Sequence, residues 1–479
     1  MDQNNENKKI MPLRYNEKTW LSGRIAETTG GFASHRGAQA YCLHFRGDGS
    51  AVWTVEAARQ ETFDLKLAYF AGKAAARVTL RLGSQTVCQV FPPVNGYASQ
   101  QIPMRDPAMM QNPEDCESVE VVDTLTIPEG IREIHLQVET CGEFRVFYLE
   151  LIPRSAKAAI EEKEAEAAHL RPSTFALAQK GYGLFIHWTA RTKPRYGEML
   201  PYEEAVNAFD AERFARQAEE MGAQYVIFTT NHGSEAFPAP LTAWNKYHPG
   251  KITARDLPAD LITALEKRGI QLFLYLHIPH MAGFPSDYGT SFNFTNTAMR
   301  DTAAQSEICG RICEMLEEIG LRYGEKLAGY WLDCWQPMVL KYGTDPTEQV
   351  YKAAKAGNSR RLTSFAFGVR CPTCTPWQDY ACGETRVIGM LPKEGRYAGG
   401  QSKGYPYHSI LVLDDDWWHD FYDNPIADPQ YSADQLSDYI RGCMKNGGLV
   451  TVNTAVYQDG TVSPKTMDVM KLTKKRVYA

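Results

Sequence analysis

The amino-acid sequence predicts an α/β fold in which a (β/α)8 TIM-like barrel follows an antiparallel β-sandwich. Two observations predict it: short runs of alternating polarity fill the chain up to about residue 152, and apolar runs alternate with amphipathic segments after Lys180. With 479 residues the chain is long enough for both domains. We expect the sandwich over residues 1–154, a helical linker over 155–172 and the barrel over 173–479.

The N-terminal part contains short segments in which apolar and polar residues alternate, separated by clusters of Gly, Pro and Asn. Alternation with a period of two buries one face of each strand, as in an antiparallel sandwich. The expected strands cover residues 51–55, 63–69, 77–82, 133–138 and 144–151. Residues 155–170, rich in Ala, Glu and Lys, are expected to form the connecting helix.

The C-terminal part has the pattern of repeated βα units, which favours a parallel sheet. Expected strands cover residues 183–186, 225–229, 272–276, 327–332, 362–369, 409–413 and 449–452, and expected helices cover 211–221, 257–268, 306–323 and 433–446. Seven or eight such strands in about 300 residues fit a (β/α)8 barrel. A doubly wound open sheet is less favoured, because no Gly-rich phosphate loop opens a helix after the first strand.

Composition limits the classes of partner. A hydrophobic fraction of 44% with a net charge of -6 indicates a globular protein without a basic field for nucleic acid or acidic lipid. The N-terminal residues include no apolar stretch of signal-peptide length, and no later run reaches membrane-spanning length, so we expect a cytoplasmic protein. Eleven scattered cysteines favour a reducing compartment over a disulfide framework.

Four of the cysteines lie close in the sequence either to Asp333 or to one another. Cys334 directly follows Asp333, and Cys371, Cys374 and Cys382 fall within twelve residues. The spacing of Cys371 and Cys374 suits zinc, but zinc ribbons need a second ligand pair, which the sequence does not clearly supply. Free cysteines often pack as small buried hydrophobes. The sequence therefore predicts no metal and no cofactor.

Polar side chains follow several of the expected strands at the point where each strand ends. They are His187, Asn231 with His232, His277 with His280, Asp333, and Arg370. In a closed parallel barrel such residues converge on one mouth and form a pocket. An aspartate after a strand is commonly a helix cap or turn residue, and His277 and His280 are the most readily explained as structural residues.

The residue types at these ends suggest sugar chemistry. Glycoside cleavage requires two carboxyl groups, and Asp333 supplies one. Candidates for the second are Glu198, Glu235, Glu384 and the run Asp414-Asp415-Asp416, which is better interpreted as a solvated loop or cap. Aromatic residues that could stack on a sugar ring or fill the core are Trp188, Tyr196, Trp244, Trp331, Trp335, Trp377, Trp417 and Trp418.

Ordered motifs from about residue 180 to 465 resemble one known family. They are Gly183-Leu184-Phe185-Ile186-His187-Trp188, Tyr196-Gly197-Glu198, the run from Gly222 to His232, Tyr330-Trp331-Leu332-Asp333, Asp379-Tyr380-Ala381-Cys382-Gly383-Glu384, the run from Lys445 to Asn453, and Asp459-Gly460-Thr461. In this order they resemble the α-L-fucosidases of glycoside hydrolase family 29.

The resemblance implies a retaining exo-glycosidase that hydrolyses terminal α-L-fucosides of an oligosaccharide or glycoconjugate by double displacement. It implies that Asp333 is the nucleophile and Glu384 the acid/base. It also implies that the sugar is held by His187, Glu198, His232, Tyr275, Trp331 and Arg370. A fixed cation at Arg370 would keep Asp333 ionised, whereas Glu384 needs an environment that raises its pKa.

Departures from the family pattern leave alternatives open. His232 is followed by Gly233 rather than a second histidine, His277 follows Tyr275-Leu276 where many members have two tyrosines, and Tyr407-His408 replaces a tryptophan–glutamate pair. The alternatives are a glycosidase of this fold acting on another sugar, and a carbohydrate-binding protein without catalysis.

The expected N-terminal sandwich resembles a carbohydrate-binding module of family 6 or 35. Many α-L-fucosidases of glycoside hydrolase family 29 carry a β-sandwich after the barrel, whereas here it comes first. It could bind glycan, bridge subunits of a homo-oligomer, or brace the barrel.

Overall fold

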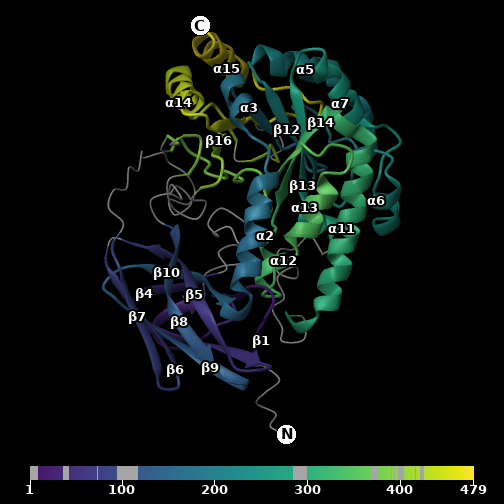
Figure 1. Ribbon diagram of the computed structural model, residues 1–479. Coiled ribbons are helices and arrows are strands. Elements are labelled where there is room, and N and C mark those ends of the chain that lie inside the picture. The colour runs from purple at the N-terminus through teal and green to yellow at the C-terminus, as the bar shows by residue number, and fades with distance from the viewer. Residues whose placement is uncertain are drawn as a thin grey trace.

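The computed structural model describes residues 9–35, 42–72, 74–93, 117–283, 299–367, 375–389, 391–392, 394–397, 404–415, 417–420 and 425–479. Two sheets dominate it, one from each half of the chain (Figure 1). Arg370, Cys371, Cys374 and Asp416 lie outside the described residues.

Within the residues that the structure describes, the N-terminal sheet has ten strands. They are β1 (Ile10–Pro12), β2 (Thr19–Ser22), β3 (Glu27–His35), β4 (Leu43–Ala57), β5 (Glu61–Ala71), β6 (Ala76–Leu82), β7 (Gln85–Phe91), β8 (Glu117–Ile127), β9 (Gly130–Thr140) and β10 (Phe144–Pro153). Their main order is β7-β6-β9-β4-β10-β5-β8, with β1 and β3 on β4 and β2 on β10; only β1 pairs parallel. All five strands expected here lie within these elements.

The N-terminal sheet curls back on itself. The Gln85 side chain, at the start of β7, donates to the Thr126 carbonyl at 2.7 Å and accepts from the Thr126 amide at 2.9 Å in β8. Because β7 and β8 are the two ends of the main strand order, these bonds bring its edges together. The structure thus joins the predicted antiparallel strands in one nearly closed sheet.

A helical segment joins the two sheets, as expected for residues 155–170. It consists of a 3-10 turn (Arg154–Ala156), α2 (Lys157–Leu170) and α3 (Phe175–Lys180). Lys18 of the N-terminal part forms ion pairs with Glu150 of β10 at 2.9 Å and with Glu164 of α2 at 2.5 Å. The linker helix is therefore fixed to the N-terminal sheet, and Figure 1 shows it running between the two sheets.

In the described part of the C-terminal half, the sheet has seven strands, all parallel. They are β11 (Gly183–Ile186), β12 (Tyr225–Asn231), β13 (Gln271–His277), β14 (Leu327–Asp333), β15 (Leu362–Phe365), β16 (His408–Val412) and β17 (Leu449–Asn453). Their order is β15-β14-β13-β12-β11-β17-β16. Each expected strand matches one of them within two residues, except that β15 ends four residues earlier than predicted.

Helices connect the parallel strands and cover one face of the sheet (Figure 1). They are α4 (Tyr202–Ala208), α5 (Ala211–Glu220), α6 (Thr242–Tyr247), α7 (Leu257–Glu266), α8 (Ile278–Met281), α11 (Thr302–Tyr323), α12 (Gln336–Leu340), α13 (Thr347–Ala354), α14 (Ala433–Lys445) and α15 (Pro464–Val477). Aspartates cap α5, α7 and α11 by accepting a backbone N–H, as the preference for Asp at this position predicts. None of the helices in the described ranges has the length and apolar character needed to cross a bilayer.

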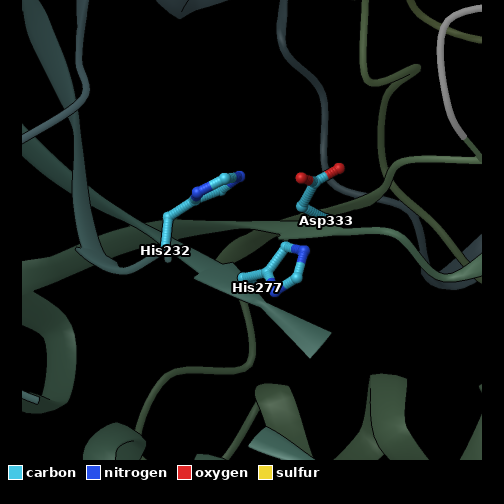
Figure 2. Close-up of side chains that lie close together, drawn as sticks. All are labelled: His232, His277 and Asp333. Atoms are coloured by element: carbon cyan, nitrogen blue, oxygen red, sulfur yellow. The ribbon is translucent and has the colours of Figure 1, made fainter. Parts of the chain in front are cut away.

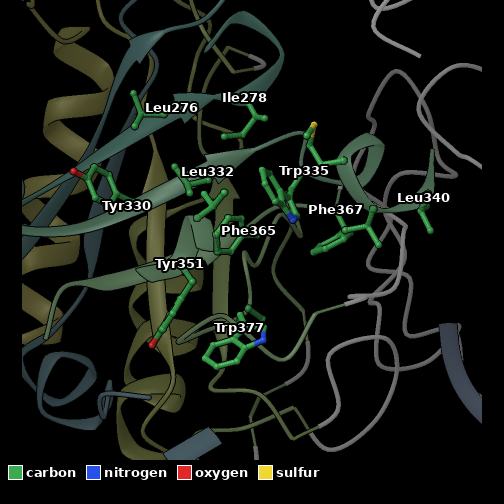
Figure 3. Close-up of a cluster of buried hydrophobic side chains, with 14 of the residues drawn as sticks. Leu276, Ile278, Tyr330, Leu332, Trp335, Leu340, Tyr351, Phe365, Phe367 and Trp377 are labelled. Carbon is green, nitrogen blue, oxygen red and sulfur yellow. The ribbon is translucent and has the colours of Figure 1, made fainter. Parts of the chain in front are cut away.

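Residue alternation along the parallel strands gives the sheet two apolar layers. Phe185, Ile227, Tyr275 and Trp331 belong to a cluster on the inner side, away from the main core. Their chain neighbours belong to the large core on the helix side, and Figure 3 shows Leu276, Tyr330, Leu332 and Phe365 among these residues. Since side chains two residues apart share a face, His187, His277 and Asp333 follow the inner layer to the carboxyl end of the sheet.

An irregular segment lies between β15 and β16, the two ends of the strand order. The Asp379 amide donates to the Thr363 carbonyl of β15 at 2.8 Å. On the other side, the Arg386 amide donates to the Ile410 carbonyl of β16 at 2.8 Å, and the Ile410 amide donates to the Gly383 carbonyl at 2.7 Å. Residues 379–386 therefore take backbone hydrogen bonds from both edge strands without forming a regular strand.

Candidate active site

Asp333 lies at the last position of β14, opposite His277 in the register of the β13–β14 pair. The Tyr275 hydroxyl donates to Oδ2 at 2.5 Å, and the Cys334 amide donates to Oδ1 at 2.7 Å. Cys334 adopts a φ of 59°, which turns the chain sharply away from the strand. The carboxyl group is thus held in one orientation while its residue keeps partial exposure.

Burial raises the pKa of Asp333 above its ordinary value, and the bonds from Tyr275 and Cys334 oppose that rise. The two donors therefore favour the ionised form of a carboxyl group that its surroundings would otherwise protonate.

Glu384 is carried by the irregular segment between β15 and β16. Gly383, just before it, has a φ of 70°, and a Cβ at this position would collide with the carbonyl of His408. The next residue is anchored by a 2.8 Å hydrogen bond between Thr385 Oγ1 and Ser409 Oγ. This close approach to β16 fixes the position of Glu384.

Burial and the nearby charge of Asp333 raise the pKa of Glu384 to about 8, and Arg386 opposes the rise. Two carboxyl groups therefore share one site, and Glu384 is protonated at neutral pH. A carboxyl group held protonated in this way can act as an acid, and a second carboxyl group beside it can act in its ionised form as nucleophile or base.

The aromatic ring of Trp331 lies beside Asp333. The side chain is 2% exposed, and its ring stacks on that of Tyr275 with centroids 5.2 Å apart and planes 16° apart. Its Nε1 donates to the Cys382 carbonyl at 2.9 Å, two residues before Glu384. The indole thus joins the strand of Asp333 to the segment of Glu384.

Four histidines surround the same space. The ring centroids of His187 and His232 lie 5.9 Å apart, those of His232 and His277 4.8 Å, and those of His277 and His280 4.2 Å. Burial lowers the pKa of every member of this cluster, for His232 to about 3 and for His280 to about 4. All four imidazoles are therefore neutral at neutral pH.

A break in the β12–β13 ladder brings two of these histidines together. The register shifts between Thr229 and Asn231, and the buried Asn231 side chain accepts from the His277 amide at 2.9 Å and donates to its carbonyl at 3.2 Å. His232 follows directly, so its ring lies beside that of His277. Figure 2 shows both imidazoles and the Asp333 carboxylate around one space.

Some residues of this site were missed by sequence reasoning. The guanidinium of Arg386 lies 5.0 Å from the ring centroid of Trp417, whose ring is 5.4 Å from that of His187. Asn453, the last residue of β17, donates to the Trp417 carbonyl at 3.2 Å and hydrogen bonds to His187. Asn453 stands at the end of a predicted strand, as His187 does, so the same sequence signal could have identified it as a site residue.

A further tryptophan packs on the histidine cluster. The Trp418 ring centroid lies 4.8 Å from that of His232 and 5.8 Å from that of His187. The sequence presents Trp417 and Trp418 only as two of many aromatic residues, and their placement here follows from the fold of the loop after β16.

Comparison with known proteins identifies the family. A family model described as Alpha-L-fucosidase matches residues 196–473, more than half of the chain. The chain belongs to the α-L-fucosidase family. It is accordingly a glycoside hydrolase, as the ordered motifs predicted. No curated protein matches the sequence.

Solved α-L-fucosidases are similar to the chain at low identity. The glycoside hydrolase family 29 enzyme from Bacteroides thetaiotaomicron is 17% identical, over 64% of this chain and 73% of its own, with a TM-score of 0.44. Isoenzyme 1 from Paenibacillus thiaminolyticus is 16% identical over 62% and 73%, with a TM-score of 0.45. AlfC from Lactobacillus casei is 18% identical over 64% and 98%, with a TM-score of 0.43.

The residues that the α-L-fucosidase resemblance assigned are brought together in most cases. His187, His232, Tyr275 and Trp331 lie around Asp333, as the contacts above show. Glu198 is exposed in the loop after β11, and no contact within the described residues joins it to this group. Arg370 lies outside the described residues.

The interpretation of the aspartate run as a solvated loop is wrong for Asp414. This residue is 4% exposed; its Oδ1 accepts from the Ala455 amide at 2.8 Å and its Oδ2 from the Thr466 hydroxyl at 2.9 Å. Asp414 thus ties the loop after β16 to the start of α15. Asp415 has a similar role, because it accepts from the Ala427 amide and pairs with His419.

Proposed function

We propose that the protein is a retaining exo-α-L-fucosidase that works by double displacement, with Asp333 as nucleophile and Glu384 as acid/base. The observation that carries this proposal is the contrast between the two carboxyl groups: hydrogen bonds to Asp333 favour its ionised form, whereas burial and the charge of Asp333 raise the pKa of Glu384 to about 8. A retaining mechanism needs one group of each kind.

In the first step, Asp333 attacks the anomeric carbon, and the bond from that carbon to the leaving oxygen breaks. Glu384 gives its proton to the leaving oxygen, and a glycosyl ester forms on Asp333. In the second step, Glu384 takes a proton from water, and the water oxygen displaces the Asp333 carboxylate. Fucose leaves with its original anomeric configuration, and both carboxyl groups return to their starting states.

The sugar pocket in this proposal is formed by aromatic and imidazole groups. The face of Trp331 and the Tyr275 hydroxyl bound the position beside Asp333, where the apolar face of a 6-deoxy sugar can stack. Neutral imidazoles at His187 and His232 can donate and accept hydrogen bonds with sugar hydroxyls. Glu198 and Arg370 are proposed as sugar ligands on the family resemblance alone.

We also propose that residues 173–479 form a (β/α)8 barrel, in which residues 379–386 take the place of the eighth strand. Their backbone bonds to both β15 and β16 support it. We further propose the domain limits 1–154 and 155–172 for the N-terminal β domain and the linker.

A bracing role for the N-terminal domain is favoured by contacts with the turn after α12. The Trp20 amide donates to the Gly343 carbonyl at 3.2 Å, and a Cβ at Gly343 would meet the Met11 sulfur at 2.6 Å. This turn follows shortly after Asp333 in the chain. Carbohydrate binding by the N-terminal domain stays a hypothesis based on its resemblance to a binding module.

The decisive experiment is covalent trapping. A 2-deoxy-2-fluoro-α-L-fucosyl fluoride slows the second step, so an ester should accumulate on the intact protein and appear as one added fluorofucosyl unit by mass spectrometry. Peptide mapping should then locate the label on Asp333. A label on another carboxylate would overturn the nucleophile assignment, and absence of both labelling and turnover would favour a carbohydrate-binding protein without catalysis.

A second candidate function is a glycosidase of this family acting on another sugar. The observation that favours it is His277, whose buried imidazole lies next to Asp333. Many members of the family are expected to carry a tyrosine near this position. A panel of aryl α-L-fucosides, galactosides and other deoxy-sugar glycosides distinguishes the two. Turnover of another glycoside with no turnover of the fucoside would reject the fucose assignment.

A further inference from the structure

Three side chains of the candidate active site have the donor set of a metal centre. His232, His277 and Asp333 come from the carboxyl ends of the adjacent strands β12, β13 and β14. Each offers one ligand atom, and these three atoms lie within 4.8 Å of one another. Figure 2 shows the three side chains around one shared space. His277 has no part in the mechanism proposed above.

We propose that His232, His277 and Asp333 form a three-ligand site for a divalent transition metal ion of the Zn²⁺ class. Two imidazole nitrogens and one carboxylate oxygen suit Zn²⁺, Co²⁺ and Ni²⁺, whereas Mg²⁺ and Ca²⁺ prefer oxygen ligands alone. Three protein ligands on one side of the ion leave the opposite side open to water or a sugar hydroxyl.

The spacing allows such an ion with small adjustments. Bonds of ~2.0–2.2 Å to three tetrahedral ligands hold the ligand atoms roughly 3.3–3.5 Å apart. The widest separation here, 4.8 Å, would therefore contract by roughly 1.3–1.5 Å on binding. His232 is only partly buried, so rotation of its side chain can supply this movement.

The surroundings orient two of the ligands before any ion binds. Asn231 holds the backbone of His277 through two hydrogen bonds of 2.9 and 3.2 Å, which fixes the histidine pair. The Tyr275 hydroxyl and the Cys334 amide each donate to a different oxygen of Asp333. A carboxylate has about four acceptor sites, so lone pairs are left for a metal, and such outer partners commonly orient metal ligands.

An ion at this site would control the proposed reaction. It would take up the electron pair with which Asp333 attacks the anomeric carbon, so Zn²⁺ should inhibit hydrolysis in competition with substrate. This consequence rests on the proposed function. Binding of the ion does not, so the two are tested separately.

Other donor groups of the chain supply the controls. His135 pairs with Glu133 at 3.3 Å on the surface, an exposed histidine–carboxylate pair that offers two ligands rather than three. The sequence also contains Cys371 and Cys374 at a spacing that suits zinc. Removing these thiols as Cys371→Ser/Cys374→Ser leaves the histidine site to be measured alone.

The test is calorimetric titration of the full chain in this double-serine background with ZnCl₂ after chelator treatment. We expect one equivalent of Zn²⁺ to bind and MgCl₂ to give no binding. His277→Ala and His232→Asn should each weaken Zn²⁺ affinity by about 100-fold or more, since loss of even an outer-shell partner costs 10–100-fold. His135→Gln should bind as the parent protein does. His232 is partly exposed, so its variant remains informative if His277→Ala does not fold.

A Co²⁺ titration identifies the ligands. The otherwise unmutated chain should show visible d–d bands that vanish in His277→Ala, without a sulfur-to-cobalt charge-transfer band. Absent Zn²⁺ binding, or equal affinity in both histidine variants and their parent, would overturn the metal site. Binding without any glycoside turnover would leave the metal site standing and remove the proposed function; turnover without binding would do the reverse.

Discussion

Carboxyl groups in the N-terminal sheet and in the candidate active site differ in the charged groups that lie beside them. Glu150 of the N-terminal sheet is 5% exposed, pairs with Lys18 at 2.9 Å and accepts from Trp20 Nε1 at 3.2 Å. Although burial opposes it, Lys18 and Lys66 lower the pKa of Glu150 below its ordinary value. In the pocket, the pKa values of Asp333 and Glu384 are raised instead.

The difference distinguishes a structural carboxylate from a reactive one. Among the described residues Asp333 has no ion-pair partner, and it accepts hydrogen bonds from uncharged groups, the Tyr275 hydroxyl and the amide and side chain of Cys334. A carboxylate neutralised by lysines has little capacity to attack carbon or exchange protons at neutral pH. The Glu150–Lys18 pair therefore stabilises the fold, whereas the proposed catalytic residues Asp333 and Glu384 are not neutralised by lysines in this way.

Removing the proposed nucleophile should have the largest effect on activity. Asp333→Asn keeps the size of the side chain but loses the attacking charge, so kcat/KM for an aryl α-L-fucoside should fall by ~10⁴- to 10⁶-fold. The matched variant in the other sheet, Glu150→Gln, should keep wild-type kcat/KM. Initial-rate kinetics at neutral pH measure both. Near-normal turnover by Asp333→Asn would place the reactive carboxylate elsewhere.

Removing the proposed acid/base should have a smaller effect that depends on the substrate. For Glu384→Ala, fucosides with poor leaving groups should lose ~10²- to 10⁴-fold in kcat/KM, because their oxygen must be protonated as it departs. Fucosides with acidic phenol leaving groups should lose much less in the first step. A series of aryl fucosides of graded phenol pKa gives the comparison. Equal losses across the series would point to another acid, such as Glu235.

Breaking the structural pair should lower stability without changing chemistry. Glu150→Gln leaves Lys18 without its buried partner, and the free energy of unfolding should fall by about 3 kcal/mol. Lys66→Met removes a half-exposed partner 3.8 Å from Glu150 and should cost less than about 1 kcal/mol. Chemical denaturation followed by fluorescence measures both values. A large loss of kcat in either variant would contradict the division of roles.

The sequence predicted the framework of the site because that framework follows local periodicity. Asp333, His187 and His232 stand where apolar runs end, and such ends meet at one edge of a parallel sheet. The predicted strands agree with the observed ones for the same reason: each is a short apolar run bounded by helix and turn signals. Glu384 was predicted from ordered motifs, since it lies on no regular strand.

The features of the fold and site that the sequence did not predict depend on contacts between segments far apart in the chain. The register shift at Thr229 and Asn231, which brings His232 beside His277, has no sequence signal, because a bulge depends on the partner strand. Asp414 looked solvated because three aspartates in a row suggest a surface loop; its burial depends on donors from Ala455 and Thr466, 41 and 52 residues away. The edge contact between Gln85 and Thr126 is equally nonlocal.

The smallest predicted effect is on the pH profile, and it tests the charges that set the pKa of Glu384. Glu384 must be protonated to act as acid in the first step, and its pKa is raised to about 8, so kcat/KM should fall as pH rises through about 8. One pH unit above that pKa the loss should be about tenfold. Arg386 lowers this pKa, so Arg386→Gln should move the basic limb to higher pH. The limb should disappear in Glu384→Ala; its persistence there, or a shift to lower pH in Arg386→Gln, would mean that another group titrates.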